Sequence, residues 1–128
     1  MNSIVLDASA ILAIVNREPG HEKLTPQLLS RAIASTVNVA EAHTKLVKGG
    51  WNSDEAWNDA AGFIKETVVF DEEHARLTGN LSVQTHTFGL SLGDRACLAL
   101  GIILQAPIYT AERIWKNLQL NVRIHIIR

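Results

Sequence analysis

The chain has 128 residues, of which 47% are apolar, and a formal net charge of −1. This length is typical of one domain that buries roughly two-thirds of its extended surface on folding, so we predict a single domain over residues 1–128. The lone Cys97 excludes an internal disulfide and a cysteine-rich zinc site, and the five histidines lack metal-ligand spacing. No signal peptide or membrane span is recognisable, which favours a cytoplasmic protein without membrane contact.

The first part of the chain alternates between short apolar runs and helical patterns. Residues 3–6 are predicted to form a buried strand, and residues 8–16 a helix that Pro-Gly closes. A weaker helix is predicted over 21–30. Residues 32–36 resemble a second strand, and 37–48 a helix that stops at two glycines.

The middle of the chain continues the alternation. A capping signal at 53–55 predicts a helix through residue 65. Residues 67–70 are β-branched and aromatic and are predicted to form a third strand. A helix is predicted over 71–86, with acids in its first turn as the helix dipole favours. Another helix is predicted from 91 to 105.

The last segments complete the pattern with a fourth strand at 107–110, a short helix at 111–118 and a fifth strand at 122–127. Strands that alternate with helices imply right-handed crossovers and a mostly parallel sheet covered on both faces. The predicted fold class is therefore α/β, a three-layer sandwich.

Four acids occupy special places in this pattern, because ligands of open α/β sheets bind beyond the carboxyl ends of the strands. Asp7 follows the first strand, Glu41 lies in the helix after the second, and Glu112 follows the fourth. Asp94 belongs to the first turn of the helix that leads into the fourth strand. Each of Asp7, Asp94 and Glu112 also has a local interpretation as a helix cap or a dipole partner.

Carboxylates gathered at one edge would repel one another and raise one another's pKa values. A hard divalent cation, Mg²⁺ or Mn²⁺, relieves that repulsion because it prefers oxygen ligands. Such a site polarises a phosphate and activates water for attack on phosphorus. Seven of the thirteen acids lie between Asp54 and Glu73, and the rest of the chain holds eleven bases and six acids. If four of those six acids hold a metal, the remaining surface is basic and suits a polyanionic partner, whereas the alternative interpretation is a scatter of solvated charges.

Four stretches resemble the PIN-domain ribonucleases, and in particular the VapC toxins of bacterial toxin–antitoxin pairs. They occur in that family's order and spacing over most of the chain: VLDASAILAIVNREPG at 5–20, ASTVNVAEAHTKLVKGG at 34–50, LSLGDRACLALG at 90–101 and PIYTAERIWKNL at 107–118. The resemblance implies a PIN-like fold with an acidic catalytic centre.

The resemblance also implies individual roles. Asp7, Glu41 and Asp94 would form the acidic centre, with Asp7 and Asp94 as direct metal ligands. Ser9 and Asn38 match small polar positions that support such a site. The fourth acid in the family is usually Asp, whereas Glu112 carries its carboxylate one methylene further from the backbone. This departure puts the distance from Glu112 to a metal, and the presence of a second ion, in question.

Four basic residues near these acids are candidates for contact with RNA phosphates. Lys45 and Lys48 share the helix face of Glu41, and Arg95 and Arg113 adjoin Asp94 and Glu112. The alternative interpretation is that Lys45 pairs with Glu41 and that the others are ordinary surface residues.

The resemblance implies an Mg²⁺- or Mn²⁺-dependent endoribonuclease that cuts structured RNA such as tRNA or rRNA at few places. It further implies a homodimer and a cognate VapB-type antitoxin that occupies the groove. Two other hypotheses remain open. The domain would bind RNA or protein without cutting if Glu112 marks a loss of activity. A phosphatase or phosphoacceptor would use Asp7 as nucleophile, although the usual paired Asp is replaced by Ser9.

Overall fold

A five-stranded, entirely parallel sheet forms the centre of the computed structural model, which describes residues 2–128. The strand order is β3-β2-β1-β4-β5. The strands are short: β1 Ile4–Leu6, β2 Ala32–Ser35, β3 Glu66–Val68, β4 Ile108–Thr110 and β5 Ile124–Ile126. Val5 of β1 pairs with Ile33 on one side and Ile108 on the other, so β1 lies in the middle of the sheet. The predicted α/β class is confirmed, with parallel pairing throughout.

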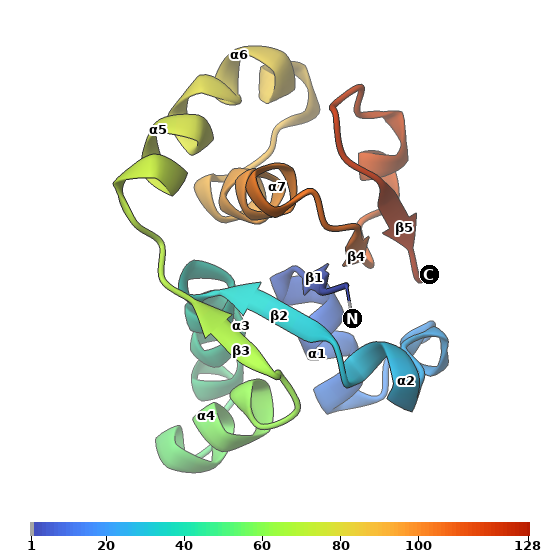
Figure 1. Ribbon diagram of the computed structural model, residues 1–128. Coiled ribbons are helices and arrows are strands. Elements are labelled where there is room, and N and C mark those ends of the chain that lie inside the picture. The colour runs from blue at the N-terminus through green and yellow to red at the C-terminus, as the bar shows by residue number, and fades with distance from the viewer. Residues whose placement is uncertain (1) are drawn as a thin grey trace.

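Helices cover both faces of this sheet (Figure 1), which confirms the three-layer sandwich. On one face lie α1 Ala8–Asn16, α3 Thr36–Lys48 and α4 Ser53–Ala61, and on the other α5 Glu72–Asn80, α6 Ser82–Thr85 and α7 Leu92–Leu104. Successive side chains of a strand point to opposite faces. Accordingly, Ile4 and Leu6 of β1 belong to the core beneath α1 and α3, and Val5 to the core beneath α7.

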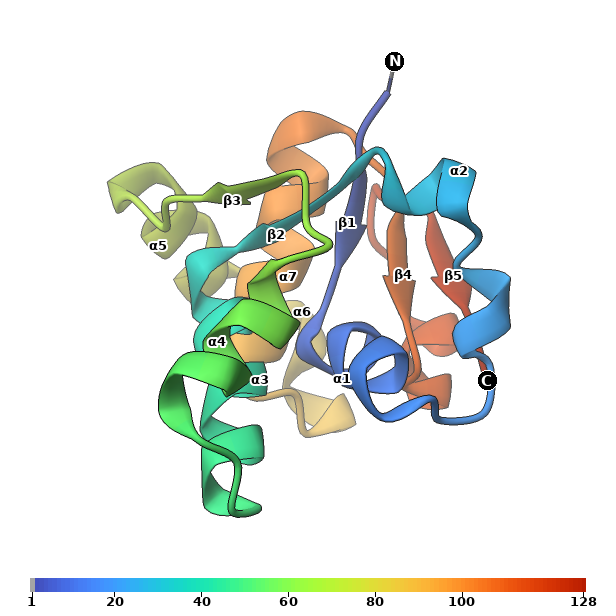
Figure 2. The same ribbon diagram turned by 90° about the horizontal axis from the view of Figure 1, so that it is seen from below.

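The helices that carry the candidate acids have the predicted positions because their ends are encoded locally. The Asp7 side chain caps α1, Ser35 caps α3 and Ser91 caps α7. Figure 2 shows α1 beginning where β1 ends, while β4 and β5 run in the same direction as β1. These connections bring residues after β1 and β4 to one edge of the sheet.

Two predicted helices in the first half are wrong in extent. The helix expected over 21–30 is interrupted, and consists of a 3₁₀ turn η1 His21–Lys23 and the single-turn helix α2 Pro26–Leu29. Pro26 disfavours helical geometry in the residue before it, and Thr25 caps α2 with its side chain. The helix expected to reach residue 65 is α4, which Asn52 rather than Ser53 caps and which ends at residue 61.

Two later predictions are also wrong in detail. The helix expected over 71–86 is divided into α5, α6 and a 3₁₀ turn η2 His86–Phe88. The helix expected over 111–118 is a shorter 3₁₀ segment, η3 Arg113–Asn117. Before it, the hydroxyl of Ser9 accepts a hydrogen bond from the backbone N–H of Ala111, and that of Thr110 from the N–H of Glu112.

The third strand starts one residue earlier and ends two residues earlier than predicted, at Glu66–Val68 instead of 67–70. Among the described residues, no helix combines the length and apolar character required to cross a bilayer.

Candidate active site

The four candidate acids line one pocket of about 240 Å³, although they come from four separate parts of the chain. The pocket lies at the carboxyl edge of β1 and β4, between the start of α1, the first turns of α3 and the N-terminus of α7. Its lining comprises Asp7, Ala8, Ser9, Glu41, Lys45, Ser91, Asp94 and Glu112. The predicted meeting of Asp7, Glu41, Asp94 and Glu112 is therefore observed.

Asp7 is the most enclosed of these acids, with 3% of its surface exposed. Its Oδ1 accepts a hydrogen bond of 2.9 Å from the N–H of Ala10 and caps α1. The Ser9 hydroxyl lies 2.8 Å from Oδ1 and 2.9 Å from Oδ2, and the Thr110 hydroxyl donates to Oδ2 at 2.7 Å. The Asp7 side chain thus caps α1 and also lines the acid pocket.

Burial raises the pKa of Asp7 from its ordinary value of 3.8 to about 6. Hydrogen bonds from Thr110, Ala10 and Ser9 oppose this rise, whereas the negative charge of Asp94 adds to it. A carboxylate whose charged form is disfavoured by burial gains most from a nearby cation.

Glu41 lies half-buried in α3, where Asn38 holds it. The Asn38 side-chain amide donates to Glu41 Oε1 at 3.0 Å and to the carbonyl oxygen of Gly93 at 2.9 Å. Desolvation and the charge of Asp94 raise the pKa of Glu41, while Asn38 and Lys45 lower it. Asn38 itself is buried, and its Oδ1 has no hydrogen-bond partner within residues 2–128.

Asp94 completes a capping box at the start of α7. Its carboxylate accepts the N–H of Ser91 at 2.9 Å through Oδ2, and its own N–H donates to the Ser91 hydroxyl at 3.1 Å. This local bonding fixes the direction of the side chain, and its charge contributes to the raised pKa values of both Asp7 and Glu41.

Glu112 is exposed and forms the outer wall of the pocket. It also lines an adjoining hollow of about 340 Å³, which shares Ser9 and Lys45 with the acid pocket and extends to Arg128. The backbone N–H of Glu112 donates to the Thr110 hydroxyl at 3.0 Å.

Thr110 is a site residue that the sequence reasoning missed. Its buried hydroxyl contacts Asp7, Ser9 and the backbone of Glu112. A signal for it existed: Thr110 ends a predicted strand two residues before a candidate acid, at the edge where Asp7 was also expected.

The four basic candidates differ in their placement. Lys45 lines both the acid pocket and the adjoining hollow. Lys48 and Arg113 are exposed and line neither of these two spaces. The guanidinium of Arg95 donates to the carbonyl of Thr78 at 2.8 Å, which joins α7 to α5. Of these four residues, Lys45 is the one that lines the acid pocket.

The chemistry of the acid pocket fits a hard divalent ion. The donors are carboxylate oxygens, and the charge on one acid opposes ionisation of its neighbours, a cost that a bound cation removes. Cys97, a softer donor, is buried behind the pocket, and the burial together with the charge of Asp7 raises the pKa of its thiol. Asp7 and Asp94 remain the residues that would hold the ion.

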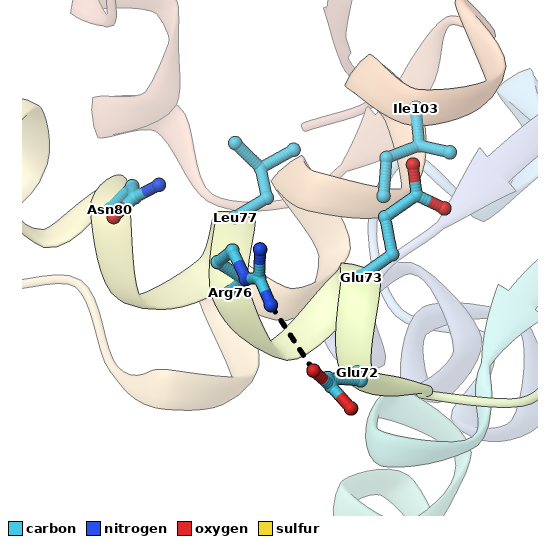
Figure 3. A pocket seen from close by; sticks show the side chains of 6 residues that line it. All are labelled: Glu72, Glu73, Arg76, Leu77, Asn80 and Ile103. Atoms are coloured by element: carbon cyan, nitrogen blue, oxygen red, sulfur yellow. Dashed lines mark hydrogen bonds and ion pairs between the residues drawn. The ribbon is translucent and has the colours of Figure 1, made fainter.

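A separate acidic group was not anticipated from the sequence. Donor atoms of Asp71, Glu73 and His74, around the start of α5, lie within 4.8 Å of one another. An adjacent hollow of about 500 Å³ runs along α5 and contains the Arg76–Glu72 ion pair of 3.1 Å (Figure 3). None of the four candidate acids lines this hollow. Asp71 caps α5 through a 3.1 Å bond from the N–H of His74, so its position has a local structural explanation.

Comparison with known proteins gives a consistent result for the fold. The model of the PIN domain family matches residues 4–119. None of the curated proteins compared matches the chain.

Several solved structures are similar across nearly the whole chain. In DNA-bound VapBC from Salmonella typhimurium, the matching chain is 15% identical with a TM-score of 0.78, and 100% of both chains is covered. In VapBC2 from Rickettsia felis bound to a promoter DNA fragment, the matching chain is 16% identical with a TM-score of 0.74, and 98% of each chain is covered. VapC20 from Mycobacterium tuberculosis, described as a sarcin-ricin loop cleaving toxin, is 16% identical with a TM-score of 0.69, over 94% of this chain and 99% of VapC20.

Proposed function

Because the chain belongs to the PIN domain family, we propose that it is a divalent-metal-dependent endoribonuclease that hydrolyses phosphodiester bonds in RNA. The observation that carries the proposal is the shared pocket of Asp7, Glu41, Asp94 and Glu112. Within it, buried Asp7 has a pKa raised to about 6, so the pocket holds negative charge at a cost that a cation relieves.

In this proposal Asp7 and Asp94 hold Mg²⁺ or Mn²⁺. When bound, the ion supplies polarisation of the scissile phosphate and acidification of water. Ser9 and Thr110 orient the carboxylate of Asp7 through their hydroxyls. These two residues restrict the rotation of Asp7 and keep its charge directed into the pocket.

Glu41 would orient the attacking water and accept its proton. A general base works best when its pKa lies near the working pH, and burial together with Asp94 raises the pKa of Glu41 in that direction. Asn38 fixes the carboxyl group by its bond to Oε1. Glu112 would complete the acidic pocket, and Lys45 would bind an RNA phosphate at the junction with the adjoining hollow.

We further propose that the nuclease is the toxin of a toxin–antitoxin pair. The support is the similarity of fold to chains of VapBC structures from several organisms. The proposed partners are a cognate VapB-type antitoxin and a second copy of the chain in a homodimer. The proposed substrate is a structured RNA of the cytoplasm, such as tRNA or rRNA, and the similarity to VapC20 supports the second of these.

Incubation of the purified protein with total cellular RNA tests this function. The reactions contain Mg²⁺, Mn²⁺ or EDTA, and a parallel set uses the Asp7→Asn variant. Discrete fragments that require the ion and disappear with the variant are expected, and mapping of their ends identifies the target. Absence of cleavage by folded, antitoxin-free, ion-supplied protein would reject the nuclease and favour an RNA- or protein-binding module.

A further inference from the structure

Gly93 occupies the first turn of α7, between the cap residue Ser91 and the acid Asp94. Glycine is less favourable than alanine inside a helix, because its backbone loses more freedom on folding. Gly93 lies within the α-helical segment, and its φ is outside the positive range that favours glycine. The conformation of the chain therefore does not require glycine here.

The space beside Gly93 is filled by Glu41. A Cβ atom built on residue 93 would overlap the Glu41 carboxyl group, and the three nearest atoms are its Oε1, Oε2 and Cδ. The carboxyl group of Glu41, in α3, thus lies against the backbone of Gly93 in α7. It fills the volume that a side chain at residue 93 would occupy. Gly93 is buried, whereas Glu41 is half-buried and lines the acid pocket.

Asn38 ties the two partners together. Its side-chain amide donates both to Glu41 Oε1 at 3.0 Å and to the carbonyl oxygen of Gly93 at 2.9 Å. A single NH₂ group therefore sets the carboxyl group and the turn of α7 at fixed positions relative to each other. Asp94, the next residue along α7, reaches the same pocket.

We propose that Gly93 is a positioning residue whose missing side chain allows the Glu41 carboxyl group to lie against α7 within the acid pocket. A side chain at residue 93 displaces Glu41 rather than the backbone, because the atoms it meets are the far end of a flexible side chain. The function assigned to Glu41 rests on the proposed nuclease activity, whereas its displacement does not.

Two other helical glycines provide matched controls. At Gly79 in α5 an added Cβ meets no atom within 4 Å from the rest of the described chain, beyond its own neighbours and the local helix backbone. At Gly101 in α7 it meets the side chains of Ile108 and Val122, which pack in the core. Gly79→Ala is expected to leave activity unchanged and to raise the melting temperature slightly, because alanine is more favourable than glycine in a helix, and Gly101→Ala to lower the melting temperature.

The test compares Gly93→Ala with these controls by thermal melting and by rates of cleavage of total cellular RNA at several RNA concentrations. Gly93→Ala is expected to melt close to the Gly79→Ala control. Displacement of a reacting group by about 1 Å costs up to about 10²-fold in rate, so kcat should fall by at least about tenfold while KM for RNA changes little. Wild-type kcat in folded Gly93→Ala would overturn the proposal.

A double-mutant cycle with Glu41→Asp shows whether Gly93 acts through Glu41. The shorter aspartate withdraws the carboxyl group from residue 93, so Gly93→Ala should cost much less in the Glu41→Asp background than in the wild type. Equal losses in both backgrounds would contradict the proposal. So would a loss of folding in Gly93→Ala that Glu41→Ala does not relieve.

A crystal structure of Gly93→Ala separates this proposal from the proposed function. Glu41 is expected in a changed rotamer, with its hydrogen bond to Asn38 lost. If Glu41 has the same position in the variant as in the wild type, the positioning role is rejected, even when the wild-type protein is shown to cut RNA. Wild-type protein that cuts RNA no faster than Asp7→Asn rejects the nuclease function, and the structure of the variant still decides the positioning role.

Discussion

The hydroxyl of Thr110 donates a 2.7 Å hydrogen bond to Oδ2 of Asp7, although the two residues lie 103 positions apart in the chain. The contact joins the end of β4 to the residue that follows β1, across neighbouring parallel strands. It opposes the effect of burial on the pKa of Asp7, so it favours the charged form that a metal ligand requires.

Thr110→Val should therefore weaken the site while preserving its shape. Hydrogen bonds to charged groups contribute about 1.5–3 kcal/mol, so we expect cleavage slower by roughly tenfold or more. The pKa of Asp7 should rise further, which moves the acid limb of the pH–rate profile to higher pH. Thr110→Ser keeps the hydroxyl and is the matched control, and equal profiles for the two variants would contradict this account.

Asp7→Asn should abolish cleavage and stabilise the metal-free protein. A pKa raised from 3.8 to about 6 means that the folded state binds the proton more tightly than the unfolded state. The charged carboxylate therefore costs stability as pH rises from about 4 to about 6, by on the order of 3 kcal/mol at neutral pH. Melting curves in EDTA should show that the advantage of the variant is small near pH 4 and largest above pH 6.

Divalent ions should stabilise the wild type through the acid pocket. At ten times its dissociation constant, Mn²⁺ should add about 1.4 kcal/mol, which raises the melting temperature by about 5 °C. Asp7→Asn should show little of this shift. A His74→Ala variant should retain it, because His74 belongs to the separate acidic group at α5. If instead Asp7→Asn keeps the shift in melting temperature and His74→Ala loses it, the ion binds at α5.

Glu112→Asp should cut RNA at least as fast as the wild type, because the carboxylate keeps its charge and the backbone N–H of residue 112 is fixed by Thr110. Glu112→Gln removes the charge. Since the side chain is exposed, the electrostatic loss should be about 1 kcal/mol, or roughly fivefold in rate. Initial rates with total RNA measure both effects, and a loss as large as that of Asp7→Asn would make Glu112 a principal acid.

Lys45→Ala should weaken RNA binding more than catalysis. Lys45 lines both spaces around the acids, whereas Lys48 on the same helix lines neither. Removal of one phosphate contact should lower the slope of log affinity against log salt by about 1. Binding of RNA to the Asp7→Asn protein with Lys45→Ala or Lys48→Ala added, measured across a salt series, tests the difference. Equal salt slopes for the Lys45→Ala and Lys48→Ala proteins would exclude Lys45 as an RNA phosphate contact.

The starts of several helices are determined by residues that are close to them in the sequence. The caps of α1, α3 and α7 are Asp7, Ser35 and Ser91, each directly before its helix. Capping depends on residues two or three positions away, so these helix starts could be predicted without knowledge of the fold. The extents of the helices expected at 53–65 and 71–86 could not, because the packing of the chain decides where weak helical patterns end.

The sequence by itself determined the α/β class, the order of elements and the four acids at the edge of a parallel sheet. Only the tertiary structure decided how those acids are held. Thr110 reaches Asp7, and Asn38 reaches the carbonyl of Gly93, 55 positions away, because the sheet and α3–α7 packing bring distant segments into contact. Hydrogen bonds and steric fit act over a few ångströms, and separation along the sequence does not reveal which residues come that close.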